Sequence, residues 1–101
     1  MTPAIELARK HRINHRVHEY AHDPSNESYG AEAAEKLAVP ESRVFKTLVV
    51  MLDNKELAVG VIPVSSMLSM KLIAKAAGAK KAVMAAASDV ERSTGYVLGG
   101  V

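Results

Sequence analysis

The sequence predicts an α+β domain in which a mixed, partly barrel-like β-sheet is flanked by helices. Two aliphatic runs rich in β-branched residues, 44–52 and 57–62, are joined by "DNKE", which favours a β-hairpin. Helical patterns lie on both sides of this hairpin in an irregular order, which is typical of α+β architecture. The chain has 101 residues, 49% of them hydrophobic and only 4% aromatic, so a single domain over 1–101 with an aliphatic core is expected.

The residues before the hairpin are predicted to form a short helix, a strand, a turn-rich loop and a second helix, over 3–14, 15–20, 21–30 and 30–38. Thr2 has the chemistry of an N-cap, and Pro3 suits the first helical position because its missing N–H costs nothing there. The second helix is expected to end at Val39, because the residue before a proline avoids the helical region.

The residues after the hairpin are predicted to form a helix, a short strand, a second helix and the start of a further strand, over 70–77, 81–84, 88–94 and 96–101. Ser69 is expected to cap the first of these helices and Gly78 to follow its end. Ser88 and Glu91 have capping-box spacing, and Gly95 is expected to close that helix.

Composition and motifs exclude several classes of protein. The chain has no cysteine, so it has neither a disulfide framework nor a zinc–thiolate site. No apolar run suits a signal peptide or a membrane span, so a soluble cytoplasmic protein is expected. There is no P-loop, dinucleotide fingerprint or G-x-S-x-G motif, and no cofactor is predicted. The net charge of +2 and a pI near 9.0 are compatible with RNA binding without indicating it.

Lys46 is the first candidate for chemistry, because it interrupts the apolar run "VFKTLVV" (44–50). On a strand it shares a face with Leu48 and Val50, whereas Thr47 points to the opposite face. Three interpretations are open: the lysine extends to solvent from a strand end, protects a sheet edge, or projects into a concave site.

The three histidines His15, His18 and His22 suggest a metal site, but residues three apart on a strand point to opposite faces. We therefore predict no metal and favour solvated or loop-stabilising histidines. Two further features have two interpretations each. A group of lysines is either a phosphate-contacting patch or a solvated helix face: Lys71, Lys75, Lys80 and Lys81. Gly99 and Gly100 either let the backbone approach a ligand or mark a bulge in a sheet.

Several stretches occur together in a recognisable order and spacing: "MTPA" (1–4), "HDP" (22–24), "VFKTLVV" (44–50), "VIPV" (61–64), "KLIAKAAGAKK" (71–81) and "RSTGYVLGG" (92–100). With them the whole chain resembles the YbaK/EbsC family of aminoacyl-tRNA editing domains. The most specific parts are "FKTL" and "RSTGY…GG". The resemblance implies a hydrolase that removes cysteine from mischarged tRNA(Pro), acting in trans with prolyl-tRNA synthetase.

The resemblance also implies site residues. The family's key lysine falls on Lys46, its tyrosine on Tyr20 and its first pocket glycine on Gly99. Thr47 and Gly100 lie in the same region, as do two residues of the "RSTGY" stretch, Ser93 and Thr94. In members of this family the substrate's own thiol is proposed to attack its carbonyl, which would explain why no protein nucleophile stands out.

Relatives continue past the glycine pair with further strands and a late acidic residue, so a C-terminally truncated domain is expected. Such a sheet would have an unpaired edge, through which a homodimer could form, and a pocket lacking one wall. The alternative to an enzyme is a non-catalytic module that keeps the editing fold and binds tRNA or a synthetase. A metal-dependent hydrolase that uses the histidines is a third hypothesis.

Overall fold

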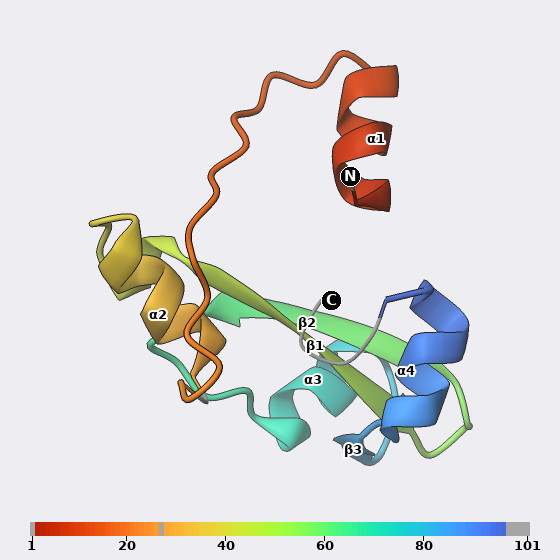
Figure 1. Cartoon of the computed structure of the whole chain (residues 1–101). Coiled ribbons are helices and arrows are strands. Elements are labelled where there is room, and N and C mark those ends of the chain that lie inside the picture. Colours follow the sequence, from red (N-terminus) through yellow and green to blue (C-terminus); the bar gives the residue numbers. More distant parts are fainter. Residues whose placement is uncertain (1, 27, 97–101) are drawn as a thin grey trace.

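The structure is a computed structural model that describes residues 2–26 and 28–96. Its elements follow one another along the chain as shown in Figure 1: α1 (Pro3–Lys10), α2 (Tyr29–Lys36), the 3-10 turn η1 (Glu41–Arg43), β1 (Phe45–Leu52), β2 (Leu57–Pro63), α3 (Met70–Ala76), β3 (Ala82–Met84) and α4 (Ala87–Thr94). Within these residues no helix combines the length and the apolar character needed to cross a membrane.

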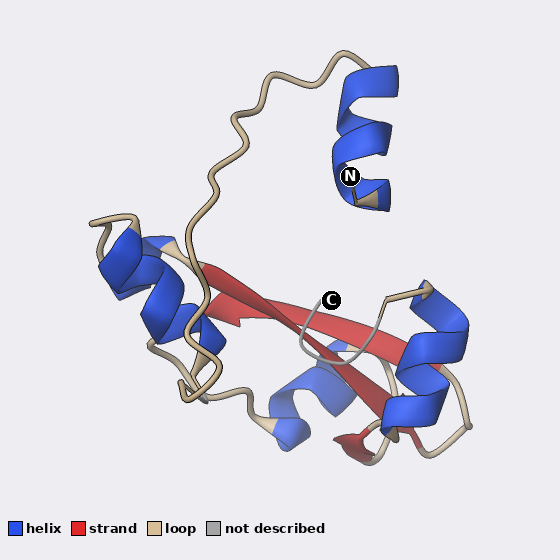
Figure 2. Ribbon diagram, viewed as in Figure 1, coloured by secondary structure: helices blue, strands red, loops and turns tan. Residues whose placement is uncertain are grey.

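The central sheet has three strands in the order β2-β1-β3 (Figure 2). The predicted α+β class is confirmed. Both strand pairings among the described residues are antiparallel rather than mixed, and the sheet does not close into a barrel. Strand β3 pairs with β1 over three residues only, from Val50 to Leu52.

The predicted hairpin is confirmed, with β1 and β2 paired from Phe45↔Pro63 to Met51↔Leu57. Its turn uses the side-chain oxygen of Asn54, which accepts a hydrogen bond from the Glu56 N–H at 3.0 Å. Lys55 takes the left-handed conformation there, with φ of 70°. The hairpin places the fully buried Val50 at the centre of the core.

Helix α3 packs on β2 at Gly60, where a side chain would fit only if its neighbours shifted by a few tenths of an ångström. A Cβ atom on Gly60 would lie 3.1 Å from both Ile73 and Leu68. The predicted end of this helix is confirmed by Gly78, which has a φ of 73° that other residues adopt at a cost. Ala74, in the middle of α3, is 1% exposed, so the helix closes one face of the core.

One of the two predicted serine caps is confirmed and the other is wrong. Ser69 caps α3, since its hydroxyl accepts a hydrogen bond from the Leu72 N–H at 3.1 Å. Helix α4 instead begins at Ala87, so Ser88 lies inside its first turn, and the cap position is held by Ala86. Capping-box spacing alone therefore did not fix the helix start, and among the described residues no side chain caps the start of α4. The predicted end at Gly95 is confirmed, with φ of 76°.

Replacing Ser69 with alanine is expected to lower the free energy of unfolding by about 1 kcal/mol, because an N–H at the start of α3 loses its acceptor. The matched control is Ser88→Ala, where no cap is lost and helix propensity improves slightly. Urea unfolding of the two variants should therefore separate them. Equal stability losses would contradict the assigned caps.

The N-terminal helix is confirmed but shorter than predicted. The Thr2 hydroxyl caps it by accepting from the Ile5 N–H at 3.3 Å, and it ends at Lys10 rather than at Asn14. In Figure 1 it is set apart from the sheet, and none of its residues is buried. The hydroxyl of Tyr96 accepts a hydrogen bond from the Ala4 N–H at 2.9 Å, which ties α1 to the far end of the described chain.

The predicted strand over 15–20 is wrong. These residues form no strand among the described residues, and from 11 to 19 every residue is exposed. Alternation of residue types favours a strand only where a sheet offers a partner, and residues 15–20 pair with none of the strands β1, β2 and β3. The loop predicted over 21–30 is confirmed for the described residues 21–26 and 28, and α2 begins at Tyr29, one residue earlier than expected.

Candidate functional site

Among the described residues, strand β1 has an open edge between Phe45 and Val49, with no partner strand on the side away from β2. On this side β3 pairs only with the later residues of β1, although the Val49 carbonyl accepts a hydrogen bond from the Ala85 N–H at 3.0 Å. Hydrogen bonds in an antiparallel pair alternate, and the carbonyl of Val44 points to β2, where it accepts from the Val64 N–H at 2.8 Å. The main-chain groups of Phe45 and Thr47 therefore face the open edge.

A cavity of about 460 Å³ lies along this edge. Its walls come from the start of α2, from β1 and from the region of β3 and α4, and include Tyr29, Gly30, Lys46, Thr47, Val64 and Val90. Helix α2 closes one end by packing directly on Val64, because a Cβ on Gly30 would lie only 2.3 Å from Val64 Cγ1. The volume suits a small ligand such as an amino acid with part of a nucleotide.

Lys46 lines this cavity and is half-buried, so it is not a freely solvated lysine. Its register partner on β2 is Ile62, and it shares a face with the buried Val50. Thr47 is half-buried and pairs with Val61, and strand alternation directs its side chain to the other face. Of the three interpretations of Lys46, its place in a cavity wall supports the concave site. Its chemical role stays a prediction.

The other predicted site residues that the structure describes do not line this cavity. Tyr20 is half-buried next to Lys36, whose ammonium nitrogen lies 5.9 Å from the centre of the tyrosine ring. Ser93 is exposed on α4. The Thr94 hydroxyl donates to the Val90 carbonyl at 2.7 Å and accepts from the Tyr96 N–H at 3.1 Å, so it supports the end of α4. The predicted residues Gly99 and Gly100 lie outside the described residues.

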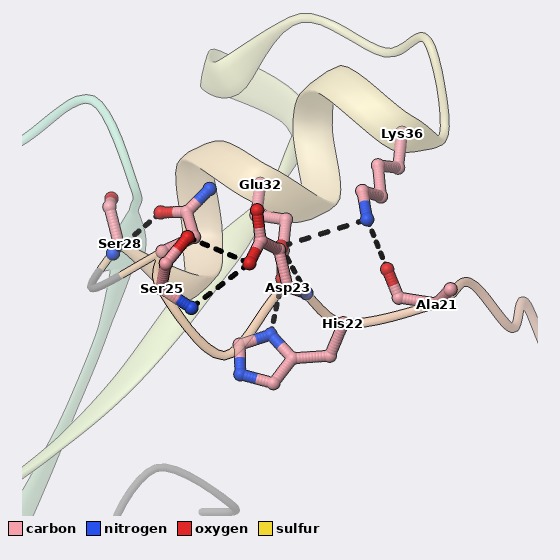
Figure 3. A network of polar contacts seen from close by, with 8 residues as sticks. Ala21, His22, Asp23, Ser25, Ser28, Glu32 and Lys36 are labelled. Atoms are coloured by element: carbon pink, nitrogen blue, oxygen red, sulfur yellow. Dashed lines mark hydrogen bonds and ion pairs between the residues drawn. The ribbon is translucent and has the colours of Figure 1, made fainter.

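Sequence reasoning missed a polar network beside the cavity, shown in Figure 3. At its centre is Glu32 of α2, whose side chain is 1% exposed. One carboxylate oxygen lies 2.5 Å from Nδ1 of His22, and the other accepts from the Asp23 N–H at 2.8 Å. Lys36, one turn further along α2, lies 3.8 Å from the carboxylate and donates to the Ala21 carbonyl. The network fastens the loop before α2 to the helix.

The hydrogen bond from His22 and, secondarily, the one from the Asp23 N–H hold the pKa of Glu32 below its ordinary value of 4.5. Asp23 has a lowered pKa for a similar reason, since its carboxylate accepts from the hydroxyl and N–H of Ser25 at 2.8 and 3.0 Å. The "HDP" stretch therefore has a structural purpose, which is to shape this loop.

The lowered pKa of Glu32 predicts an acid-sensitive contribution to stability. The contribution is fully present above pH 4.5 and is lost as the pH falls through the lower pKa of the folded state. We therefore expect Glu32→Gln to be less stable than the unmodified chain at neutral pH and to show a shallower loss below pH 4.5. Urea unfolding across this pH range tests this. Glu35→Gln, on the exposed face of the same helix, should keep the original acid profile.

The histidines do not converge. His18 is exposed, and His15 makes a local contact from Nδ1 to the Ile13 carbonyl at 2.7 Å. His22 has a loop-stabilising part through Glu32, as one of our interpretations proposed. Within the described residues no group of three or more histidines and carboxylates is placed to hold a metal ion.

The four lysines of the possible phosphate patch are all exposed, as both of their interpretations require.

The fold is that of a small α+β domain of a kind already seen in a solved structure. The crystal structure of the hypothetical protein APE2540 matches 97% of this chain with a TM-score of 0.77 and 31% sequence identity. The family model described as "Aminoacyl-tRNA editing domain" matches residues 23–101. The chain therefore belongs to the aminoacyl-tRNA editing domain family, as its resemblance implied.

A curated relative carries a more specific name. Over 100 residues the chain is 37% identical to "Putative Cys-tRNA(Pro)/Cys-tRNA(Cys) deacylase EbsC" of Enterococcus faecalis. The match covers 98% of this chain and 60% of that protein, while the solved structure is covered to 63%. The chain thus spans about three fifths of the length of the relatives it matches.

Proposed function

We propose that the chain is a trans-editing hydrolase that deacylates mischarged tRNA, with Cys-tRNA(Pro) as its substrate. Membership of the editing family and the name of the Enterococcus relative support this proposal. The observation that carries it is the position of Lys46, a half-buried cation in a cavity wall beside main-chain groups of an open strand edge.

The substrate class follows from how poorly a synthetase can distinguish cysteine from proline. Cysteine and proline have similar volumes, so a synthetase pocket separates them by only a few kcal/mol, and a second site is needed to remove errors. An aminoacyl ester is already activated. A rate gain of about 10³–10⁴-fold needs only about 4–5.5 kcal/mol of transition-state stabilisation, which positioning and hydrogen-bond donors supply.

In the proposed mechanism the sulfur of the bound cysteine attacks its own ester carbonyl. The new carbon–sulfur bond forms as the bond to the ribose oxygen breaks, and the thiol proton ends on that oxygen. Water then opens the cyclic thioester and gives free cysteine. The protein needs no nucleophile. Its task is to hold the ester and stabilise the negative charge that develops on the carbonyl oxygen.

Each predicted site residue has a part in this proposal. Lys46 places its charge near the ester or the terminal phosphate, and the main chain at Gly99 and Gly100 donates to the carbonyl oxygen. Tyr20 orients the amino acid. Contacts from Thr47, and from Ser93 and Thr94, would complete substrate binding. The N–H of Thr47 faces the open edge beside the cavity and is a second source of a main-chain donor.

The proposed partners are mischarged tRNA and prolyl-tRNA synthetase, and the proposed location is the cytoplasm, where tRNA is charged. We also propose a homodimer through a sheet edge. The described sheet offers the outer edge of β2 and the open edge of β1. Pairing along β2 leaves the cavity free, whereas pairing along β1 would fill it. Light scattering with and without tRNA tests this arrangement.

The decisive experiment is incubation of the chain with a panel of mischarged tRNAs, recording which esters disappear. Full-length Enterococcus EbsC is the comparison enzyme. Preferential loss of Cys-tRNA(Pro) is the expected result. Binding of tRNA without loss of any ester would favour the non-catalytic binding module instead. Activity that is abolished by a chelator would point to a metal-dependent hydrolase.

A further inference from the structure

We propose that His22 and Glu32 form a positioning pair that holds the ring of Tyr29 in the wall of the cavity and so governs substrate affinity. This inference rests on the proposed function, because the substrate is the ligand whose affinity would change. His22 lies in the "HDP" stretch that contributes to the family resemblance, but the resemblance assigned no part in the site to His22, Tyr29 or Glu32.

The first step concerns Glu32, which is buried yet fully supplied with partners. Burying a carboxylate is costly unless hydrogen bonds and opposite charge compensate for the lost water. Here His22 and the Asp23 N–H bind one oxygen each, at 2.5 and 2.8 Å, and Lys36 adds positive charge at 3.8 Å. Glu32 therefore holds the ring of His22, which lies in the loop before α2, against this helix; Figure 3 shows the contact.

The second step concerns what the fixed imidazole ring touches. With Nδ1 turned to Glu32, the ring of His22 stacks on the ring of Tyr29, with centroids 5.0 Å apart and planes inclined by 26°. Stacked rings at this separation attract one another. The edge of the imidazole ring therefore binds Glu32 while its face packs on Tyr29.

The third step connects the stack to the cavity. Tyr29 begins α2 and lines the cavity, but it is 52% exposed and so has few contacts of its own to select one rotamer. Stacking on His22 favours one rotamer of Tyr29. Because the ring is already held in the position that it takes in the complex, less conformational entropy is lost when a ligand binds. His22 thus acts on the substrate through Tyr29 and is not itself a catalytic residue.

The experiment measures kcat and KM for Cys-tRNA(Pro) deacylation in His22→Ala, Tyr29→Ala and the double variant. Each single change is expected to raise KM about fivefold to tenfold with little change in kcat, the size of effect that a stacked pair contributes. Because His22 acts through Tyr29, the double variant should match Tyr29→Ala alone. His22→Asn keeps a donor for Glu32 without the ring, so it should raise KM while preserving stability.

The matched control is His18→Ala, an exposed histidine of the same segment, which should leave both constants unchanged. Multiplying effects in the double variant, or an equal effect of His18→Ala, would overturn the proposal. A readout without substrate separates it from the proposed function: the NMR shifts of the Tyr29 ring protons should move in His22→Asn. Unmoved shifts overturn the positioning pair. If the shifts move but the unmodified chain hydrolyses no ester, the positioning pair is supported and the deacylase function is rejected.

Discussion

Replacing Lys46 with alanine is expected to lower the rate of Cys-tRNA(Pro) deacylation by about 10²–10³-fold, the cost of removing one preorganised charge-stabilising group. The lysine is half-buried in the cavity wall, where its charge acts on a bound ester with less screening than at the surface. The measurement is single-turnover decay of the ester with the enzyme in excess.

Two controls sharpen this experiment. Lys55→Asn removes a lysine from the β1–β2 turn, at the other end of the strand, and asparagine tolerates the positive φ there. Its rate should stay within about twofold of the unmodified chain, since surface substitutions far from the site have small effects. Thermal unfolding of Lys46→Ala must show a folded protein. Full turnover by folded Lys46→Ala would remove the lysine from the mechanism.

Replacing Gly30 with alanine is expected to have the largest effect on stability. The new Cβ would lie 2.3 Å from Cγ1 and 2.8 Å from Cβ of Val64. Rotating the valine moves Cγ1 but not its Cβ, so the backbone of α2 or of the segment after β2 must shift. Such overpacking costs about 1–3 kcal/mol, from which about 1 kcal/mol of improved helix propensity is to be subtracted. We expect a net loss of up to about 2 kcal/mol and a Tm lower by up to about 10 °C.

The identity of the clash can be tested with a second substitution. Val64→Ala removes Cγ1, so the double variant should be more stable than the sum of the two single losses predicts. Glu35→Ala, on the exposed face of α2, should be nearly neutral. Differential scanning calorimetry of these variants gives the comparison. A Gly30→Ala protein as stable as the unmodified chain would show that α2 does not press on Val64.

The parts of the fold that sequence predicted well have strong local signals. The hairpin was predicted because two β-branched runs flank a polar turn, and α3 because Ser69 and Gly78 mark its ends. Residues 15–20 alternate as a strand does, yet they reach no neighbour in the sheet. A strand forms only where another strand pairs with it, and the residues of one segment do not show whether such a partner exists.

A residue of the candidate site could be predicted where its chemical type differs from that of its neighbours in the sequence. Lys46 stands out as a charge within an apolar run. Glu32 does not, because in "AEAAEK" it resembles Glu35, and only packing makes one buried and the other exposed. Tyr29 likewise gains its place in the wall from the contact between Gly30 and Val64, two residues far apart in the chain.

The exposed chain between α1 and the loop that precedes α2 has a consequence for handling the protein. Arg12 and Arg16 lie in this stretch without regular structure, so trypsin should cut there first while the hairpin remains resistant. After such a nick α1 would be held by noncovalent contacts such as the bond from Ala4 to Tyr96, and gel filtration would separate it from the rest. Brief digestion is therefore a simple way to ask what the first helix contributes.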